Sequence, residues 1–133
     1  MAIIVDADVI ILAEKGGFDF KNWCASFLDE DFEIAAITVA ELWHGVERAS
    51  GLRRRSRETF LRELISPLTV IAYSEEIAYE HARIWAELEA KGKMIGYYDL
   101  IVAATATLRG SSVATFNARH FKQVPGLKIV TPV

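Results

Sequence analysis

The sequence has little of what secreted, membrane-spanning and disulfide-stabilised proteins need. Its single cysteine, Cys24, excludes a disulfide within the chain and suits a reducing compartment. No apolar run approaches the roughly 18 residues that a membrane-spanning helix requires. No basic segment precedes the first apolar stretch, as it would in a secretory signal peptide. We therefore expect a cytoplasmic protein.

The sequence also lacks an excess of positive charge. Its net charge of −3 gives no overall basic surface for nucleic acid, although a local patch or a bound metal ion can outweigh the net sign. By contrast, apolar residues are plentiful, at 52% of the 133 residues. A chain of this length and composition can bury one core, so we expect a single domain over residues 1–133.

Short β-branched segments alternate along the chain with longer segments whose apolar residues recur at helical spacing. This alternation predicts an α/β fold with a parallel sheet and helices on both of its faces. The segment 98–109 is apolar on nearly every side, so we expect it to be a central, buried helix. The expected strands are 2–5, 33–37, 69–73, 112–115 and 128–130, and the expected helices are 9–16, 20–30, 39–49, 54–66, 75–92 and 98–109, with a short turn at 117–121.

Polar residues stand where several of these strands end or where the buried helix begins. The carboxyl ends of parallel strands meet at one edge of a sheet, where ligands usually bind. Two carboxylates about 4 Å apart repel by roughly 4 kcal/mol at an effective dielectric constant near 20, so converging acids call for a proton or a cation. Oxygen donors without cysteine or histidine favour Mg²⁺ or Mn²⁺ over zinc. The residues concerned are Asp6, Glu41, Asp99 and Asn117.

Each of these residues also has a purely structural explanation. Thr38 and Glu41 fit a capping box at a helix start. Asp99 suits the positive end of a helix dipole, and Asn117 suits an N-cap. The aspartates within 3–13 could cap the first helix. Only convergence of the acids on one edge would favour the metal site over these explanations.

Four blocks of the sequence resemble the motifs of PIN-domain ribonucleases, and most of all the VapC toxins of toxin–antitoxin pairs. The blocks occur in the family's order, and the resemblance covers essentially the whole chain. They are "IIVDADVIILA" (3–13), "ITVAELWHGVERA" (37–49), "IGYYDLIVAATA" (95–106) and "VATFNARHFKQVPGLKIV" (113–130).

The resemblance implies a three-layer α/β/α domain with a parallel sheet of about five strands, a homodimer, and a cognate VapB-type antitoxin. It implies hydrolysis of RNA phosphodiester bonds with Mg²⁺ or Mn²⁺, with tRNA or rRNA as the substrate and inhibition of translation as the result. By resemblance the metal ligands are Asp6, Glu41 and Asp99. The fourth acidic position of the family carries Asn117, and we expect Asp8 and Thr115 to support the ligands.

RNA binding needs local positive charge, and the sequence offers two sources. The run "LRRRSR" (52–57) is either an RNA contact or simply a solvated helix start. Closer in sequence to the expected site are several basic residues that we favour for contact with RNA phosphates. They are Lys91, Lys93, Arg119, His120 and Lys122.

Two other functions remain open from the sequence: a catalytically weak PIN-like module that acts by binding partners, and a structure-specific DNA nuclease of the wider superfamily. Retention of the three acids favours an enzyme over the first. The absence of inserted helices disfavours the second. Surplus aromatic residues in the first third of the chain predict an apolar groove for the antitoxin, formed by some of Phe18, Phe20, Trp23, Trp43 and Leu52.

Overall fold

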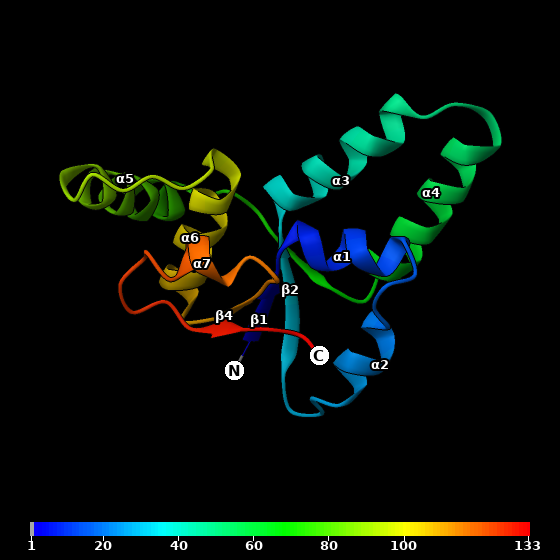
Figure 1. Ribbon diagram of the computed structural model, residues 1–133, viewed down its shortest axis with the longest axis horizontal. Helices are drawn as coiled ribbons and strands as arrows, with labels where there is room; N and C mark the ends of the chain where they lie inside the picture. Colours follow the sequence, from blue (N-terminus) through cyan, green and yellow to red (C-terminus); the bar gives the residue numbers. More distant parts are fainter. Residues whose placement is uncertain (1) are drawn as a thin grey trace.

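The computed structural model describes residues 2–133 and shows alternating strands and helices (Figure 1). No helix in this range is long and apolar enough to span a membrane. The strands are β1 (Ala2–Val5), β2 (Asp31–Ala35), β3 (Thr69–Ile71), β4 (Ser112–Ala114) and β5 (Ile129–Val130). The helices are α1 (Ala7–Glu14), α2 (Phe20–Ala25), α3 (Ala36–Arg48), α4 (Gly51–Ile65), α5 (Glu75–Ala90), α6 (Tyr97–Arg109) and α7 (Ala118–Phe121).

The five strands form one parallel sheet in the order β3-β2-β1-β4-β5. The central strand β1 is bordered by β2 and β4, so neighbours in space come from distant parts of the chain. Val5, at the end of β1, pairs with Ala114 at the end of β4. This pairing brings the segments after both strands to one edge of the sheet.

Side chains alternate across the sheet and build a hydrophobic core on each of its faces. Ile3 and Val5 of β1 point into a core shared with α1, α2, α3 and α4. Ile4 points to the opposite face, where α5, α6 and α7 cover the sheet. The buried run from Val102 to Ala106 confirms α6 as a central helix. The three-layer α/β/α arrangement expected from the sequence is therefore confirmed.

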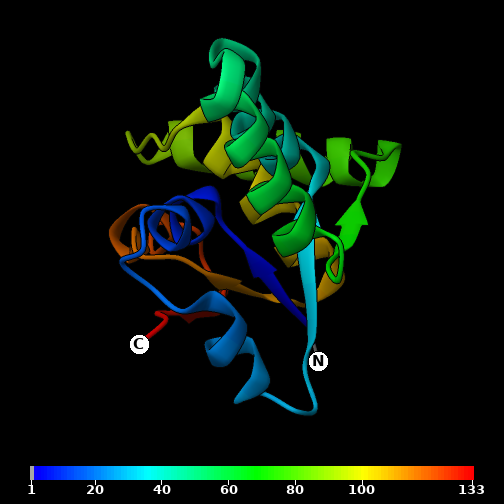
Figure 2. The same ribbon diagram turned by 90° about the vertical axis from the view of Figure 1, so that its right-hand side faces the viewer.

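The α3 and α4 helices form a hairpin that stands out from the sheet beside α1 (Figures 1 and 2). The chain reverses between them at Gly51, whose φ of +59° is a left-handed conformation that glycine adopts readily. Arg57 on α4 and Glu14 at the end of α1 form a salt bridge, with 2.8 Å between Nε and Oε2. This ion pair joins the hairpin to the first helix.

Several expected boundaries were wrong by two to five residues. The strand expected at 33–37 is β2, which ends at Ala35, and α3 begins at Ala36 rather than after Thr38. Pairing of β2 with β3 stops at Ala35 and Ile71. The sequence does not reveal this end, because β-branched residues, Ile37 and Thr38, follow Ala35. The helix expected at 20–30 ends at Ala25, and the one expected at 54–66 begins three residues earlier, at Gly51.

Candidate active site

Asp6 directly follows the last residue of β1 and is the N-cap of α1. Its carboxylate is buried, with 5% of the residue exposed. Oδ1 accepts a hydrogen bond from the backbone N–H of Ala7 at 2.9 Å, and Oδ2 accepts one from the hydroxyl of Thr115 at 2.9 Å. The capping explanation is correct for Asp6, but the cap uses only Oδ1, and Oδ2 is held by Thr115 at the sheet edge.

Asp8 points to the same place from the first turn of α1. Its Oδ2 accepts a hydrogen bond from the backbone N–H of Phe116 at 3.0 Å and lies 3.3 Å from the Thr115 hydroxyl. The hydroxyl in turn accepts from the backbone N–H of Asn117 at 2.9 Å. The segment after β4 therefore holds both aspartates of β1–α1, as the parallel pairing of the two strands requires.

Glu41 stands in the second turn of α3, since the helix begins earlier than expected. Thr38 lies inside this helix, so the capping box is wrong. Within the described range, buried Oγ1 of Thr38 and buried Oε1 of Glu41 have no hydrogen-bond partner. A buried carboxylate oxygen without a donor is unfavourable unless a proton or a cation completes its environment.

Asp99 lies in the first turn of α6 and faces the segment after β4. Its Oδ2 would be 3.5 Å from a Cβ at position 96, where the residue is glycine. Its Oδ2 is 3.5 Å from Nδ1 of His120. Asn117 occupies the N-cap position of α7, but its side chain makes no cap hydrogen bond. Nδ2 of Asn117 instead lies 2.9 Å from Nδ1 of His120. The simple N-cap explanation is therefore wrong for Asn117.

Electrostatics shows that the acids of three separate segments share one environment. Burial is the main cause that raises the pKa of Asp6 to about 7, and the charges of Asp8 and Asp99 raise it further. Burial also raises the pKa of Glu41 to about 7, with the charge of Asp99 as the second cause. The pKa of Asp8 is raised mainly by burial as well. Asp99 therefore interacts with both Asp6 and Glu41.

The donor set matches a hard divalent cation: carboxylate oxygens in a partly desolvated pocket, one of them an orphaned oxygen of Glu41. Among residues 2–133, no three acidic, histidine or cysteine side chains already form a group that could hold a metal ion. The acids are thus coupled electrostatically without forming a coordination shell.

The basic residues expected near the site are spread around it. Arg119 and Lys122 are exposed on and just after α7, and His120 between them turns toward Asp99. Lys91 pairs with Glu87 on α5, with 3.3 Å between Nζ and Oε1. The sequence suggested His120 only as an RNA contact; its proximity to Asp99 and Asn117 was missed, although the spacing of three residues from Asn117 on a short helix was a usable signal.

Residues 3–127 match the family model described as PIN domain. The chain belongs to the PIN-domain family. Two relatives place it among the VapC ribonucleases. It is 33% identical over 132 residues to ribonuclease VapC1 of Rickettsia felis, covering 98% of this chain and 96% of the relative. It is 36% identical over 96 residues to the tRNA(fMet)-specific endonuclease VapC of Salmonella typhimurium, covering 72% and 71%.

A solved structure described as DNA-bound VapBC from Salmonella typhimurium has the same fold. The TM-score is 0.88 at 29% identity, over 98% of this chain and 97% of that one. The resemblance found in the four sequence blocks is thereby confirmed, and so is the PIN-like fold class.

Cavities in this PIN domain are lined by some, but not all, of the residues expected to form an apolar groove: Phe18, Phe20 and Trp43 line cavities. Phe20 and Trp23 are buried in the core, where Trp23 packs edge-on against Phe27 and Phe32. Trp43 is half-buried beneath the guanidinium of Arg62, 4.8 Å from the ring centroid. Two adjoining cavities of about 340 and 400 Å³ lie between α2 and α4. Phe20, Lys21 and Leu64 line both, and Phe18 lines the second.

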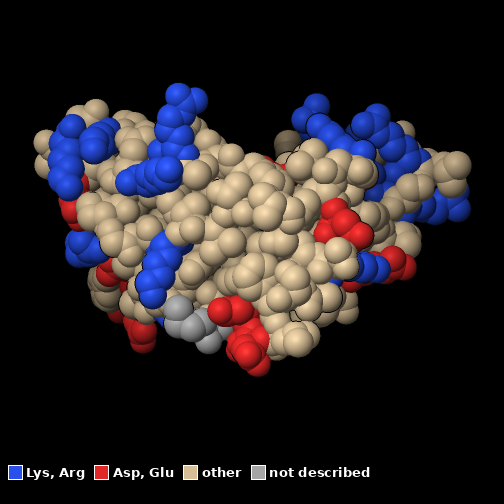
Figure 3. Space-filling model, turned by 60° about the horizontal axis from the view of Figure 1, so that its bottom comes forward, with Lys and Arg blue, Asp and Glu red and all other residues tan. Residues whose placement is uncertain are grey.

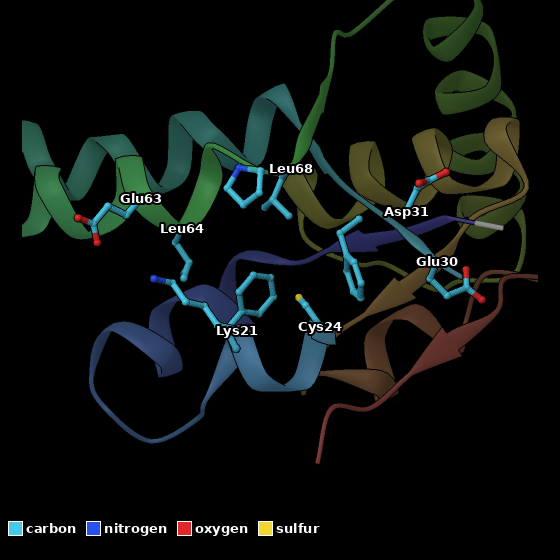
Figure 4. Close-up of a pocket in the computed structure, with 10 residues that line it drawn as sticks. Lys21, Cys24, Glu30, Asp31, Glu63, Leu64 and Leu68 are labelled. Carbon is cyan, nitrogen blue, oxygen red and sulfur yellow. The ribbon is translucent and has the colours of Figure 1, made fainter. Parts of the chain in front are cut away.

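Figure 4 shows the first of these cavities, of about 340 Å³, with apolar side chains at its floor and charged side chains at its rim. Cys24 points into it, and burial raises the pKa of this thiol to about 11, so it stays protonated at neutral pH. Leu64 and Leu68 form the apolar side, while Lys21 and Glu63 stand at the mouth. The cavity therefore suits an apolar side chain flanked by charged ones.

Proposed function

We propose that this VapC-type ribonuclease is the toxin of a toxin–antitoxin pair and hydrolyses RNA phosphodiester bonds with a divalent cation, Mg²⁺ or Mn²⁺. The observation that carries the proposal is a pair of carboxyls, the buried Asp6 and the half-buried Glu41, whose pKa values are both raised to about 7 and which both interact with Asp99. Such a set is unfavourable by itself and is relieved by a doubly charged ion.

In the proposed site, Asp6, Glu41 and Asp99 hold the cation. When bound, the ion lowers the pKa of a water molecule and offsets charge on the scissile phosphate. Thr115 fixes the orientation of Asp6 by donating to Oδ2, and Asp8 is held beside it by the Phe116 N–H. Supporting hydrogen bonds of this kind orient ligands and are as necessary as the ligands themselves.

Asn117 and His120 form the side of the site next to Asp99. We propose that the Asn117 amide orients water or RNA there, since it is neutral and adds no repulsion. Because Nδ1 of His120 faces Asp99 and Asn117, we propose that its other ring nitrogen contacts a phosphate. Lys91, Lys93, Arg119 and Lys122 supply weaker, screened attraction for RNA around this side.

A tRNA or an rRNA loop is the proposed substrate class, with inhibition of translation as the result. A curated relative named as a tRNA(fMet)-specific endonuclease supports this choice. The experiment is to induce the chain in cells and sequence the newly formed RNA 5′ ends. The purified protein should cut the same RNA with Mg²⁺ or Mn²⁺ and stop in EDTA. Undiminished cleavage in EDTA, or cleavage of single-stranded DNA alone, would overturn the proposal.

We also propose a VapB-type antitoxin as partner, supported by the VapBC complex of Salmonella typhimurium. Its docking segment would be amphipathic, with apolar side chains in the cavities between α2 and α4 and a basic side chain that reaches toward the acids. The charged rim formed by Lys21 and Glu63 would fix its register. Leu52, at 74% exposure, lies at the tip of the α3–α4 hairpin and away from these cavities.

A homodimer completes the proposal. Large aromatic side chains are exposed just before Asp99: Tyr97 is 70% exposed and Tyr98 is 51% exposed. Trp85 of α5 is 39% exposed and packs edge-on against Tyr97. Pairing of two chains through this surface would bring both acid sites to a shared groove. Light scattering at micromolar concentration should give the mass of two chains.

A further inference from the structure

A cavity lined by arginines lies where α3 ends and α4 begins. It measures about 280 Å³, and its lining contains three guanidinium groups and no acidic side chain. Figure 3 shows basic side chains gathered at the right-hand end of the molecule, over the α3–α4 hairpin. We call this cavity the arginine pocket; its lining residues are Gly45, Arg48, Ala49, Arg53 and Arg57.

The guanidinium of Arg57 is held in place on two sides. Its Nε and Nη2 donate to the carboxylate of Glu14, at 2.8 and 3.0 Å. Its Nη1 lies against Gly45, where a Cβ would come within 2.5 Å. Glycine inside a helix is less favourable than alanine, and here it makes room for the guanidinium. The N–H groups of Nη1 remain for a ligand in the pocket.

The start of α4 adds further positive charge that the protein does not balance. Ser50 makes no side-chain cap hydrogen bond, and no acid stands in the first turn. Arg53 instead lies at this positive end of the helix dipole, which is unfavourable by itself. In the described range, the neighbouring Arg54 pairs with Glu47, whereas Arg48 and Arg53 have no ion-pair partner. An anion in the pocket would satisfy both the guanidiniums and the free backbone N–H groups.

The position of the pocket relative to the acids indicates what the anion is. Arg48 follows Glu41 by seven residues on α3, which is nearly two turns, so both lie on one stripe of the helix about 10 Å apart. If one phosphate of an RNA strand lies at the acid site, a neighbouring phosphate of the same strand would therefore lie at the pocket. After Glu14 is counted, the lining keeps two unbalanced positive charges, which successive phosphates of one RNA strand, each with one negative charge, would offset.

We propose that the arginine pocket binds a backbone phosphate of the RNA, close to the bond that is cut. This inference rests on the proposed ribonuclease function and names a second contact of the same substrate. Because a phosphate contact positions the strand without reading a base, the pocket sets how RNA lies across the acids rather than which sequence is chosen.

The test measures binding of a fluorescent single-stranded RNA oligonucleotide by anisotropy at several salt concentrations. All proteins carry Asp99→Asn to prevent cleavage, so binding is measured apart from catalysis. Arg48→Ala and Arg53→Ala should each weaken binding by about three- to tenfold and lower the salt-dependence slope by about 0.7. In the cleaving protein the same substitutions should raise KM and leave kcat nearly unchanged.

Arg55→Ala is the matched control, because Arg55 is exposed on the same helix and does not line the pocket. It removes the same charge and should change RNA binding by less than about twofold. Equal losses of RNA affinity on substitution of Arg55, Arg48 and Arg53 would mean diffuse attraction by the whole α3–α4 hairpin and would overturn the inference.

Three further outcomes separate this inference from a protein-binding role and from the proposed function. If Arg48→Ala and Arg53→Ala weaken binding of an antitoxin and leave RNA binding unchanged, the pocket belongs to a protein partner and the inference is wrong. If they leave RNA binding unchanged while the parent chain still cleaves RNA, the inference fails and the ribonuclease stands. If RNA binding falls as expected but the parent chain cleaves nothing, the pocket stands and the proposed activity fails.

Discussion

The hydroxyl of Thr115 donates a hydrogen bond to Asp6, with 2.9 Å between Oγ1 and Oδ2, although 109 residues separate the two in the chain. Parallel pairing of β1 with β4 creates this contact, because both strands end at the same edge. The same hydroxyl accepts from the Asn117 N–H and therefore cannot turn away. One side chain thus connects the two segments that form the floor of the acid site.

Thr115→Val should weaken binding of the cation. The ionised form of Asp6 loses a donor, so its pKa rises further and fewer molecules have a charged ligand at neutral pH. Loss of such a supporting hydrogen bond typically lowers metal affinity about 10- to 100-fold. Calorimetric titration with Mn²⁺ measures this directly. Thr115→Ser keeps the hydroxyl and should restore most of the affinity; equal weakening in both would assign Thr115 to packing alone.

Asp99→Asn should abolish RNA cleavage and leave the fold intact. Removal of this charge takes away a ligand and also one cause of the raised pKa of Glu41 and of Asp6, so both pKa values should fall in the metal-free protein. The variant should therefore melt at the same temperature or a higher one than the parent at pH 8 without metal. Unfolding of the variant would show instead that Asp99 mainly caps α6.

The metal-free protein should become more stable on mild acidification. Asp6 and Glu41 have folded-state pKa values of about 7, well above the ordinary values near 4 of the unfolded chain. Between these limits the folded state binds more protons, so stability falls as pH rises from 5 to 8. Glu41 is partly exposed and contributes less.

We expect about 2 kcal/mol over this range, or roughly 5–10 °C in Tm. Thermal melts in EDTA at pH 5.5 and pH 8 measure it. Saturating Mn²⁺ should reverse the trend, since the ion requires ionised carboxylates. A Tm in EDTA that rises with pH would contradict the raised pKa values.

Glu63→Lys should weaken antitoxin binding without changing RNA cleavage. Glu63 is exposed at the mouth of the cavity between α2 and α4, opposite Lys21, so reversal of its charge puts two cations side by side where a partner must fit (Figure 4). Co-purification with the antitoxin and its Kd measure the first effect, and a cleavage assay measures the second. Glu58→Lys, on the same helix outside this cavity, is the control. Equal effects of both would show that general charge, rather than the groove, controls binding.

Local sequence determined much of this protein. The continuous run of apolar, mostly β-branched residues in "AIIV" (2–5) predicts a buried strand. Apolar residues on nearly every side of α6 predict a central helix. Both patterns are local to the sequence. Oxygen donors placed after strands also point to one sheet edge without any structure. For that reason the sequence singled out Asp6, Glu41 and Asp99; their role as metal ligands, and the supporting role of Asp8 and Thr115 implied by the resemblance, stay predictions.

Only the tertiary structure decided which explanation of each residue is correct. Strand β2 ends two residues earlier than the β-branched residues after it suggest, because its partner β3 ends at Ile71. Thr38 therefore lies inside the helix and forms no capping box with Glu41, whose Oε1 has no hydrogen-bond partner in the described range. The proximity of His120 to Asp99 and of Arg57 to Gly45 likewise depends on how helices from different parts of the chain pack. Burial is a property of the whole fold, so it was packing, not composition, that placed Phe20 and Trp23 in the core and raised the pKa of the acids.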